Sequence, residues 1–547
     1  MAALSAQLSR SAAPSLKSDL LRHEPVIGKR AVTAAPSRRR FARSSPALVA
    51  TVAQSSQPSP TSLRDQADAN AAAAIVTSVG PSDTFVQSLV AKYSLPAPSD
   101  AAFSAAAALG QLRNVSAEAA RVLRWPGRKD EEFRFTDLKS LRAILDKALE
   151  GAATGSESQV VSADVLAEYT LEEAKNSRLV VLDGAIRPEL SDLTGIPAQM
   201  TVKLLSELNA DEVERFVSPN LGRFAAQADL FAALNGASAA DVLVIAVPAN
   251  VKLPNHPIHI VYASSSASPA PASPRLLVVA EAGAEVEVVE EFVGGVSAGG
   301  GKGEWVNAVA EIVIGAEGSV SHAVIQNQPA KDCFNIKRTF VAQEESSKYS
   351  LVEAQLGAAH ISRHNLKMQQ LGEKTETHVD TFALAGGRQV QDLHSSLVLD
   401  FPGGVTRQLH KCIVSDATGQ CVFDGNVKVN KLAQQTDAGQ LSRSLLLVPR
   451  GTINVKPNLQ IIADDVKCTH GAAISDLDDE QLFYFRTRGI DQMTARSALV
   501  FSFAAEVVDK LPYKGLRRRV EETVKKALSA QGAMEASVAA DLQGATS

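Results

Sequence analysis

A thiol and an imidazole lie one residue apart near the C-terminal end of this chain. Cys468 and His470 belong to the run A-D-D-V-K-C-T-H-G-A at 463–472. If this run is an extended strand, alternate side chains emerge on one face, so the thiol and the imidazole point to the same side. A thiolate beside an imidazole is a ligand pair that iron, zinc or copper can use. Both residue types also serve as ordinary packing residues of strands, so metal chemistry and packing are both open at this point.

The composition is that of a globular protein with more than one folding unit. The chain has 547 residues, of which 45% are hydrophobic, 21% charged and 5% aromatic. So few aromatic side chains offer few platforms for stacking bases, and we expect no nucleic-acid partner. No apolar run reaches the roughly 18 to 20 residues needed to cross a bilayer, so we expect no membrane partner. Four cysteines without a C-x-x-C pair cannot staple a chain of this length and indicate a reducing compartment.

The first 53 residues have a composition of their own. They contain nine Lys/Arg and two acidic residues among many Ser and Ala, and they lack a continuous apolar core. This pattern is typical of an organellar transit peptide and predicts cleavage near the small residues at 47–53. The following stretch at 54–80 is rich in Ser, Pro and Ala without a helical or strand period and is expected to be a disordered linker. The remaining chain is acidic, with 46 Lys/Arg against 58 Asp/Glu.

The elements that must position Cys468 and His470 change in character along the chain. We expect an N-terminal helical region at 81–177, a mixed α/β stretch at 178–257, strands at 258–474, a C-terminal helical region at 475–530 and a tail at 531–547. The predicted helices before the strands are 83–93 after a Ser82 cap, 101–112, 117–123 after a Ser116 cap, 202–208 and 227–235. Those after the strands are 480–488 after Asp478 or Asp479, 492–511 after Asp491, and 516–528. We expect the apolar stripes of 480–488 and 492–511 to pack on the strands, and 516–528 to be solvated.

Short strands dominate between about 275 and 470. Apolar residues alternate over four to seven positions, and Gly, Asp, Asn or Pro separate the runs. Such a pattern can build a sandwich, a propeller or a solenoid. No blade signature and no strict hexapeptide repeat is present, and glycines punctuate successive runs, so the periodicity favours a β-helix only narrowly.

Long runs of residues resemble one known family. They are R-Q-L-H-K-C-I-V-S-D at 407–416, V-F-D-G-N-V-K-V at 422–429, K-P-N-L-Q-I-I-A-D-D-V-K-C-T-H-G-A at 456–472 and D-D-E-Q-L-F-Y-F-R-T-R-G-I at 478–490. Near the N-terminal end, R-K-D-E-E-F-R-F-T-D-L at 128–138 is similar to the family's charged segment. Over about 81–530 the chain resembles the SufD group of the SufB/SufD family, the iron-sulfur cluster assembly proteins of the SUF system. SufB-like members carry a different pattern in place of the D-D-V-K-C-T-H-G-A run.

The resemblance implies a fold, partners and a role. The fold is a mainly β structure, a right-handed parallel β-helix flanked by N-terminal and C-terminal α-helical regions. SufD-like members pair with SufB through their β-helices and bind the ABC-type ATPase SufC through the C-terminal helices. They are scaffold subunits and not enzymes, and no G-x-x-x-x-G-K-[ST] loop occurs here that could hold a nucleotide. Behind a transit peptide, such a chain is expected in the chloroplast or plastid stroma.

The resemblance also assigns a site. A transient iron-sulfur cluster is shared with SufB, and the family's histidine of the C-x-H motif is His470 here, which Cys468 could assist. Weak ligation from two chains suits a nascent cluster, because a permanent set of four thiolates would hold it too firmly. Asp464 and Asp465 would order the strand or orient the imidazole by a hydrogen bond.

Other titratable residues have no assigned role. Roles for His360, His364, His378 and His394 depend on a register that one sequence does not reveal. We interpret His410 and Cys412, which also share a strand face, as structural, because the family's L-H-K run usually lacks that cysteine. His322, Asp332 and Cys333 have no motif around them, and Asp400 departs from the family.

One function of a different class remains open. A catalytic β-helix, such as a polysaccharide lyase or an acyltransferase, would need a groove with paired acids, basic side chains and aromatic platforms. The low aromatic content and the lack of a dense acid cluster argue against it.

Overall fold

The computed structural model describes nine stretches of the chain: 83–98, 104–150, 166–223, 229–253, 255–264, 271–295, 305–328, 333–356 and 359–528. All of them belong to one compact unit. The predicted transit peptide, the linker, the tail and Asp332 lie outside the described residues.

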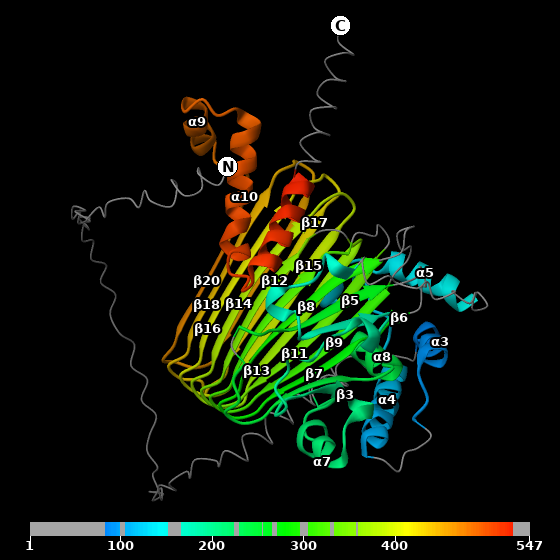
Figure 1. Cartoon of the computed structure of the whole chain (residues 1–547). Coiled ribbons are helices and arrows are strands. Elements are labelled where there is room, and N and C mark those ends of the chain that lie inside the picture. The colour runs from blue at the N-terminus through cyan, green and yellow to red at the C-terminus, as the bar shows by residue number, and fades with distance from the viewer. Residues whose placement is uncertain are drawn as a thin grey trace, which may run out of the picture. The chain divides into compact units, whose positions relative to one another are not determined.

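The described residues form a parallel β-solenoid of about seven turns, built from two long sheets (Figure 1). Sheet A has the order β2-β1-β5-β8-β10-β12-β14-β16-β18-β20, and sheet B has the order β19-β17-β15-β13-β11-β9-β7-β4-β3 with β6 beside β9. Sheet A contains β1 (Arg178–Leu182), β2 (Ala185–Ile186), β5 (Ile258–Ser264), β8 (Glu285–Gly295), β10 (Ser319–Gln326), β12 (Lys348–Gln355), β14 (Glu376–Ala385), β16 (Val405–Val414), β18 (Asp437–Leu446) and β20 (Lys467–Ser475). Sheet B contains β3 (Thr201–Leu204), β4 (Leu243–Val247), β6 (Pro271–Ala272), β7 (Arg275–Ala280), β9 (Trp305–Ile314), β11 (Phe334–Gln343), β13 (Ile361–Gln370), β15 (Val390–Leu399), β17 (Gln420–Val429) and β19 (Thr452–Ile461).

Strand alternation explains why these sequences coil into a solenoid. From β7 to β20 consecutive strands change sheet, and every second side chain points into the space between the sheets. In β16, for example, Thr406, Gln408, His410 and Cys412 are all buried in this interior. The main apolar core runs along the interior from Leu179 to Ala463. The predicted mainly β fold with a parallel β-helix is confirmed.

The sheets begin before the predicted boundary at 258. β1 pairs in parallel with β5, and β4 pairs in parallel with β7. The predicted helix at 202–208 is wrong, because β3 and a short 3-10 turn (Leu205–Glu207) occupy that stretch. β3 pairs with β4 as an antiparallel edge strand, and this pairing outweighs the local helical spacing.

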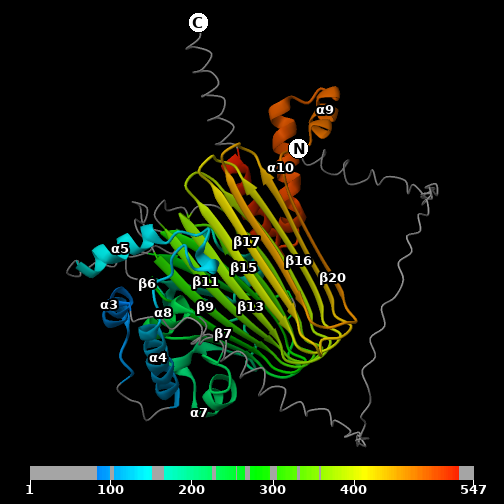
Figure 2. The same ribbon diagram turned by 180° about the vertical axis from the view of Figure 1, so that it is seen from behind.

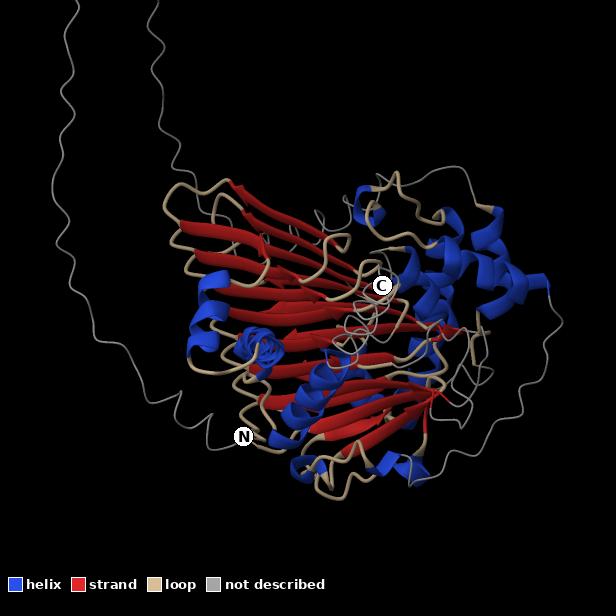
Figure 3. Ribbon diagram, turned by 90° about the horizontal axis from the view of Figure 1, so that it is seen from above, coloured by secondary structure: helices blue, strands red, loops and turns tan. Residues whose placement is uncertain are grey.

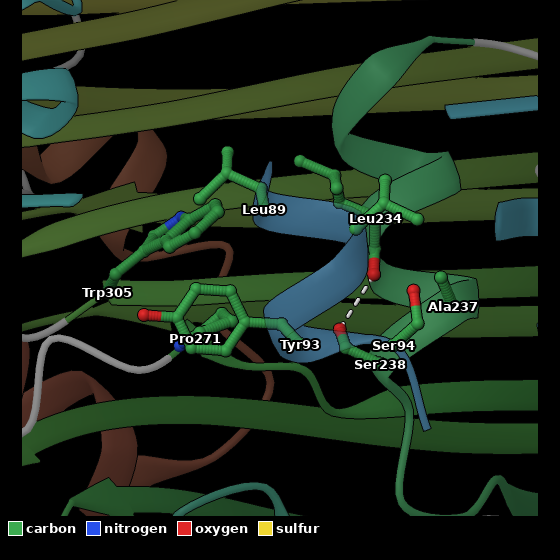
Figure 4. Close-up of a pocket in the computed structure, with 9 residues that line it drawn as sticks. Leu89, Tyr93, Ser94, Leu234, Ala237, Ser238, Pro271 and Trp305 are labelled. Carbon is green, nitrogen blue, oxygen red and sulfur yellow. Dashed lines mark hydrogen bonds between the residues drawn. The ribbon is translucent and has the colours of Figure 1, made fainter. Parts of the chain in front are cut away.

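Helices of the N-terminal region and of the mixed stretch that follows it cover the outer face of sheet B. They are α3 (Thr84–Tyr93), α4 (Ser104–Val122), α5 (Lys139–Glu150), α7 (Ala210–Glu212) and α8 (Leu230–Ser238). An apolar cluster joins α3, α5 and α8 to Trp305 and Phe334. A crevice of only about 10 Å³ lies at this packing, so α3 and α8 pack here almost without a cavity. Figure 4 shows its lining residues Leu89, Tyr93, Leu234 and Trp305.

Two predictions about the N-terminal helices are wrong. The separate helices at 101–112 and 117–123 are one helix, and Ser116 is buried inside it rather than capping it. No proline interrupts the chain there, and α8 crosses α4 so closely that a Cβ on Gly236 would lie 2.2 Å from Ser116 Oγ. The cap of α3 is Asp83, whose carboxylate accepts from the Phe85 N–H at 3.0 Å, rather than Ser82.

The C-terminal helices lie on the outer face of sheet A, so helices flank both sheets (Figure 3). They are α10 (Gln492–Val508) and a helix at 514–528, and α9 (Asp479–Thr487) precedes them without packing on the sheet. Asp478 and Asp491 cap α9 and α10, as expected. The helix at 514–528 is not solvated as predicted, because it buries Leu516, Val520 and Val524 against the sheet.

The predicted packing of the α9 stripe on the strands is wrong. No residue of α9 is buried, and Phe483 and Tyr484 are 66% and 57% exposed. α10 does pack on the sheet through Val500, Ala504 and Val507. Among the described residues, no helix is long and apolar enough to span a membrane.

Candidate functional site

The thiol and the imidazole of the C-x-H motif lie on the last strand of sheet A. Cys468 and His470 belong to β20, and their register partners on β18 are Ala438 and Gln440. Both partners are buried in the interior of the solenoid, so Cys468 and His470 also face inward, on the same side of the strand.

The end of the solenoid leaves this pair accessible. β20 and β19 are the last strands of their sheets, and within the described residues neither has a strand on its outer edge. His470 is therefore exposed although it occupies an inward position, whereas Cys468 is half-buried against the interior core. Burial raises the pKa of the Cys468 thiol above its ordinary value.

The two acidic residues of the motif lie in the turn before β20. Asp464 and Asp465 are exposed, and no hydrogen bond links either carboxylate to His470 or Cys468 within the described part of the chain. The backbone of Asp465 does hold the turn: its N–H donates to Gln434 Oε1 at 2.9 Å, and its carbonyl accepts from the Gln435 N–H at 2.6 Å. Its backbone thus orders the approach to β20, while a carboxylate that orients the imidazole stays a prediction.

No complete metal site exists within the described residues. No group of three or more His, Cys, Asp or Glu side chains lies close enough together to hold a metal ion. Behind His470, the buried amide of Gln440 donates to Gln408 at 3.1 Å. The pair on β20 can therefore supply one or two ligands, and the remaining ligands of any metal group would have to come from outside these residues.

The other histidines do not align with His470. His322, His364 and His410 are buried in the interior, where His410 stacks on Phe423 with ring centroids 4.4 Å apart. His360, His378 and His394 lie outside this interior: His378 is exposed on β14, and His394 is paired with Asp392 at 3.0 Å. Cys333 is buried, and Asp400 accepts a hydrogen bond from Asn430 at 2.6 Å.

Local sequence patterns do not predict an ionic network that lies inside the solenoid. Lys337 of sheet B donates to Glu290 of sheet A at 2.6 Å, and His322 lies 2.8 Å from the same carboxylate. In the next turn of the solenoid, His364 of β13 contacts Glu353 of β12 at 2.8 Å. Burial would raise the pKa of Glu290, but Lys337 and His322 outweigh it and hold this pKa well below its usual range. The signal in the sequence was a charged residue at an inward position of β8, between Val288 and Phe292.

A second possible site is a polar groove of about 370 Å³ on the outer face of sheet B (Figure 2 shows this side of the strands). Its charged and titratable lining residues are Lys367, His394, Asp424, Lys456, Glu131 and Glu132. Two of its three carboxylates, Asp424 and Glu131, are paired with Lys456. No Phe, Tyr or Trp is among its described lining residues, so it lacks a platform for a sugar ring.

The charged segment at 128–138 fastens the N-terminal region to sheet B beside this groove. Thr136 donates to Asp392, which is also paired with the buried Arg363. The guanidinium of Arg363 lies 4.2 Å from the ring centroid of Phe133. This segment therefore has a structural role, which explains why charged and aromatic residues alternate in it.

Comparison with known proteins places the chain in one family. The family model "SUF system FeS cluster assembly, SufBD core domain" matches residues 262–503, and the model "SufBD protein N-terminal region" matches residues 100–260. The Arabidopsis thaliana protein named "Protein ABCI7, chloroplastic" is 43% identical over 450 residues, which cover 81% of this chain and 91% of that protein. The Escherichia coli iron-sulfur cluster assembly protein SufD is 31% identical over 401 residues, which cover 72% of this chain and 87% of that protein. A SufBD family protein of Synechocystis is 40% identical over 411 residues, 74% of this chain and 87% of that protein. The solenoid, its last strand with the C-x-H motif and these matches show that this chain belongs to the SufBD family of iron-sulfur cluster assembly proteins of the SUF system.

Proposed function

We propose that this chain is a scaffold subunit that pairs with SufB and holds a nascent iron-sulfur cluster between the two chains. In this proposal His470 is a ligand of the cluster, Cys468 assists it, and SufB supplies the remaining ligands. The cluster is cargo that the assembly passes on, and ATP hydrolysis belongs to the partner SufC.

One observation carries this proposal, namely the exposure of an inward-facing histidine at the open end of the solenoid. Among the described residues, the strands of sheet A that precede β20 have a further strand beside them, whereas no strand lies beyond the position of His470. In the part of the chain that the structure describes, no strand pairs with the outer edges of β19 and β20, and such free strand edges favour pairing with another chain. A second chain docked at this end would cover His470 and place its own side chains opposite it.

The test is cluster formation by complexes that contain the His470→Ala variant. We expect the variant to co-purify with SufB and SufC in unchanged ratio, because the imidazole is exposed and its removal leaves no buried cavity. Cluster content per complex, measured anaerobically by iron and sulfide analysis and by visible absorption, should fall about tenfold or more. Even the loss of an outer-shell partner of a ligand costs about 10- to 100-fold in metal affinity.

Two matched variants control this experiment. Thr469→Ala changes the neighbour on the opposite face of β20, and His378→Ala removes an exposed imidazole from β14. Both should assemble clusters as the unaltered chain does. Normal cluster content with His470→Ala, or an equal loss with Thr469→Ala, would remove the basis of the site assignment.

The partners and the compartment belong to the same proposal. The exposed aromatic face of α9 and the start of α10 are suited to bind SufC, because apolar side chains left uncovered on a folded helix favour a protein interface. A plastid stroma location is supported by the basic, Ser/Ala-rich first 53 residues and by the similarity to a relative named as chloroplastic.

The catalytic alternative would have to use the polar groove on sheet B. Two of the groove's acids are neutralised by one lysine, and no aromatic platform lies among its described lining residues. A general acid and base pair for glycoside chemistry is thus not assembled there. The scaffold function accounts for the open end of the solenoid as well, so we favour it.

A further inference from the structure

Two buried cysteines lie near each other in the interior, apart from the proposed cluster site. Cys412 is on β16 and Cys421 is on β17, and a short turn joins these consecutive strands of opposite sheets. Each residue is 1% exposed. In sheet A, β18 lies between β16 and β20, so the thiols do not belong to the pair at Cys468 and His470.

The two sulfur atoms share one corner of the solenoid. Cys421 Sγ lies 3.9 Å from the carbonyl oxygen of Ile413, the residue that follows Cys412. Both cysteines belong to one small apolar cluster together with Ala383 and Ala385. In register, Cys412 lies between two small residues, Ala383 of β14 and Ser444 of β18.

The surroundings favour different protonation of the two sulfurs. The neighbouring Cys421 thiol, with a contribution from His410, outweighs burial and lowers the pKa of Cys412. Burial raises the pKa of Cys421. One sulfur is thus favoured as the thiolate nucleophile and the other stays protonated beside it, as in a reactive dithiol.

We propose that Cys412 and Cys421 are a redox pair that hydrogen peroxide oxidises to an intramolecular disulfide. The Cys412 thiolate attacks one peroxide oxygen, the O–O bond breaks, and hydroxide leaves to give a sulfenic acid. The Cys421 sulfur then attacks the Cys412 sulfur, the S–O bond breaks, and water leaves. In total, two thiols and one peroxide give one disulfide and two waters, and two electrons pass from sulfur to oxygen.

Burial selects the oxidant. A protein disulfide or a bulky disulfide reagent cannot reach thiols that are 1% exposed, whereas hydrogen peroxide is close to water in size. The product would link β16 to β17 across the interior, two strand positions from β20 in sheet A.

The test uses the full chain and a variant of it, Cys333→Ser combined with Cys468→Ser, which keeps only the two cysteines of the pair. The folded protein is treated with hydrogen peroxide, acid-quenched, alkylated after unfolding and analysed by mass spectrometry. We expect neither thiol to be alkylated, and an intact mass lower by about 2 Da than that of the reduced chain, the loss of two hydrogens. Trypsin places both residues in one peptide, from Cys412 to Lys428, so the same loss should be found in that peptide from the unaltered chain as well.

The controls separate the pair from chance oxidation. Cys421→Ser in the same background should show no loss of 2 Da and should give a sulfenic acid that a dimedone probe traps. Alkylatable thiols at both positions after peroxide treatment of the folded protein would overturn the proposal. The proposal would also be overturned if, in the unaltered chain, Cys412 formed a disulfide with Cys468 or if the disulfide formed only in urea. Both results are obtained with the unaltered chain, so they do not require a substituted variant to fold.

Discussion

At the scale of single residues, Asp392 joins the N-terminal region to the solenoid. Its carboxylate accepts from Thr136 of the charged segment and is paired with Arg363 of the neighbouring strand. Asp392 and Arg363 are both completely buried, so each charge depends on the other for compensation. Burial raises the pKa of Asp392, but Arg363 and His394 outweigh this and hold it far below its usual range.

We therefore predict that Asp392→Asn destabilises the protein strongly. The substitution leaves the Arg363 guanidinium buried without a counter-charge, which costs about 3–5 kcal/mol. Urea unfolding followed by circular dichroism measures this free energy.

Asp437→Asn is the matched control. It breaks the exposed pair between Asp437 and Arg407, and exposed pairs contribute about 0–1 kcal/mol. Equal losses in the two variants would show that the buried pair does not hold the charged segment to the sheet.

At the scale of elements, the C-terminal helices divide into an anchored part and a free part. The helix at 514–528 is held by buried apolar residues and by Arg519, which pairs with Glu291 at 2.6 Å. α10 is held by its apolar face and by the ion pair between Lys411 and Glu506. α9 has no buried residue, so its aromatic side chains are available to a partner (Figure 1).

We predict that Phe483→Ala weakens binding of the ATPase SufC without affecting the fold. The side chain is 66% exposed, so its removal leaves no cavity in this chain. At an interface, loss of a central aromatic side chain costs about 2 kcal/mol, which corresponds to roughly 30-fold in affinity. Titration of the purified ATPase by calorimetry measures the change.

Val122→Ala, on the exposed side of α4, is a control of similar exposure and should bind SufC with unchanged affinity. An unaltered affinity of Phe483→Ala would exclude this face of α9 from the interface.

At the scale of the whole molecule, buried carboxylates along the solenoid link stability to pH. The pKa values of Glu290, Glu353 and Asp392 are all lowered, because neighbouring basic groups and hydrogen-bond donors outweigh the effect of burial. A lowered folded pKa contributes stability above the unfolded pKa, and this contribution is lost as the pH falls toward the folded pKa. The pKa of His322 is also lowered by burial, and it acts in the same direction.

We predict that the thermal unfolding temperature falls as the pH is lowered. The decrease should begin near pH 6.5, where the unfolded histidine takes up a proton, and steepen below about pH 4, where unfolded carboxyl groups do so. Unfolding followed by circular dichroism between pH 8 and pH 3 measures it.

Glu290→Gln should be less stable at neutral pH but should lose less stability below pH 4 than the unaltered chain does. A constant unfolding temperature between pH 7 and pH 3 would contradict the assigned ion pairs.

Local patterns in the sequence determined the elements and the pairing of side chains along them. Alternation along one strand placed Cys468 and His470 on one face, and the capping residues Asp478 and Asp491 marked the starts of α9 and α10. These features depend on residues within a few positions of each other, so a period of two or a cap is sufficient to predict them.

Contacts between distant residues were decided only by the tertiary structure. The strand at 201–204, the burial of Ser116 and the anchoring of 514–528 all depend on partners far away in the chain. The register of the rungs separated His322, His364 and His410, which are buried inside, from His378 outside and His470 at the open end. The sequence by itself therefore determined the family, the strand pattern and the spacing of the motif. The tertiary structure decided which side chains are covered by the next turn of the solenoid, because neighbouring turns lie about thirty residues apart in the chain.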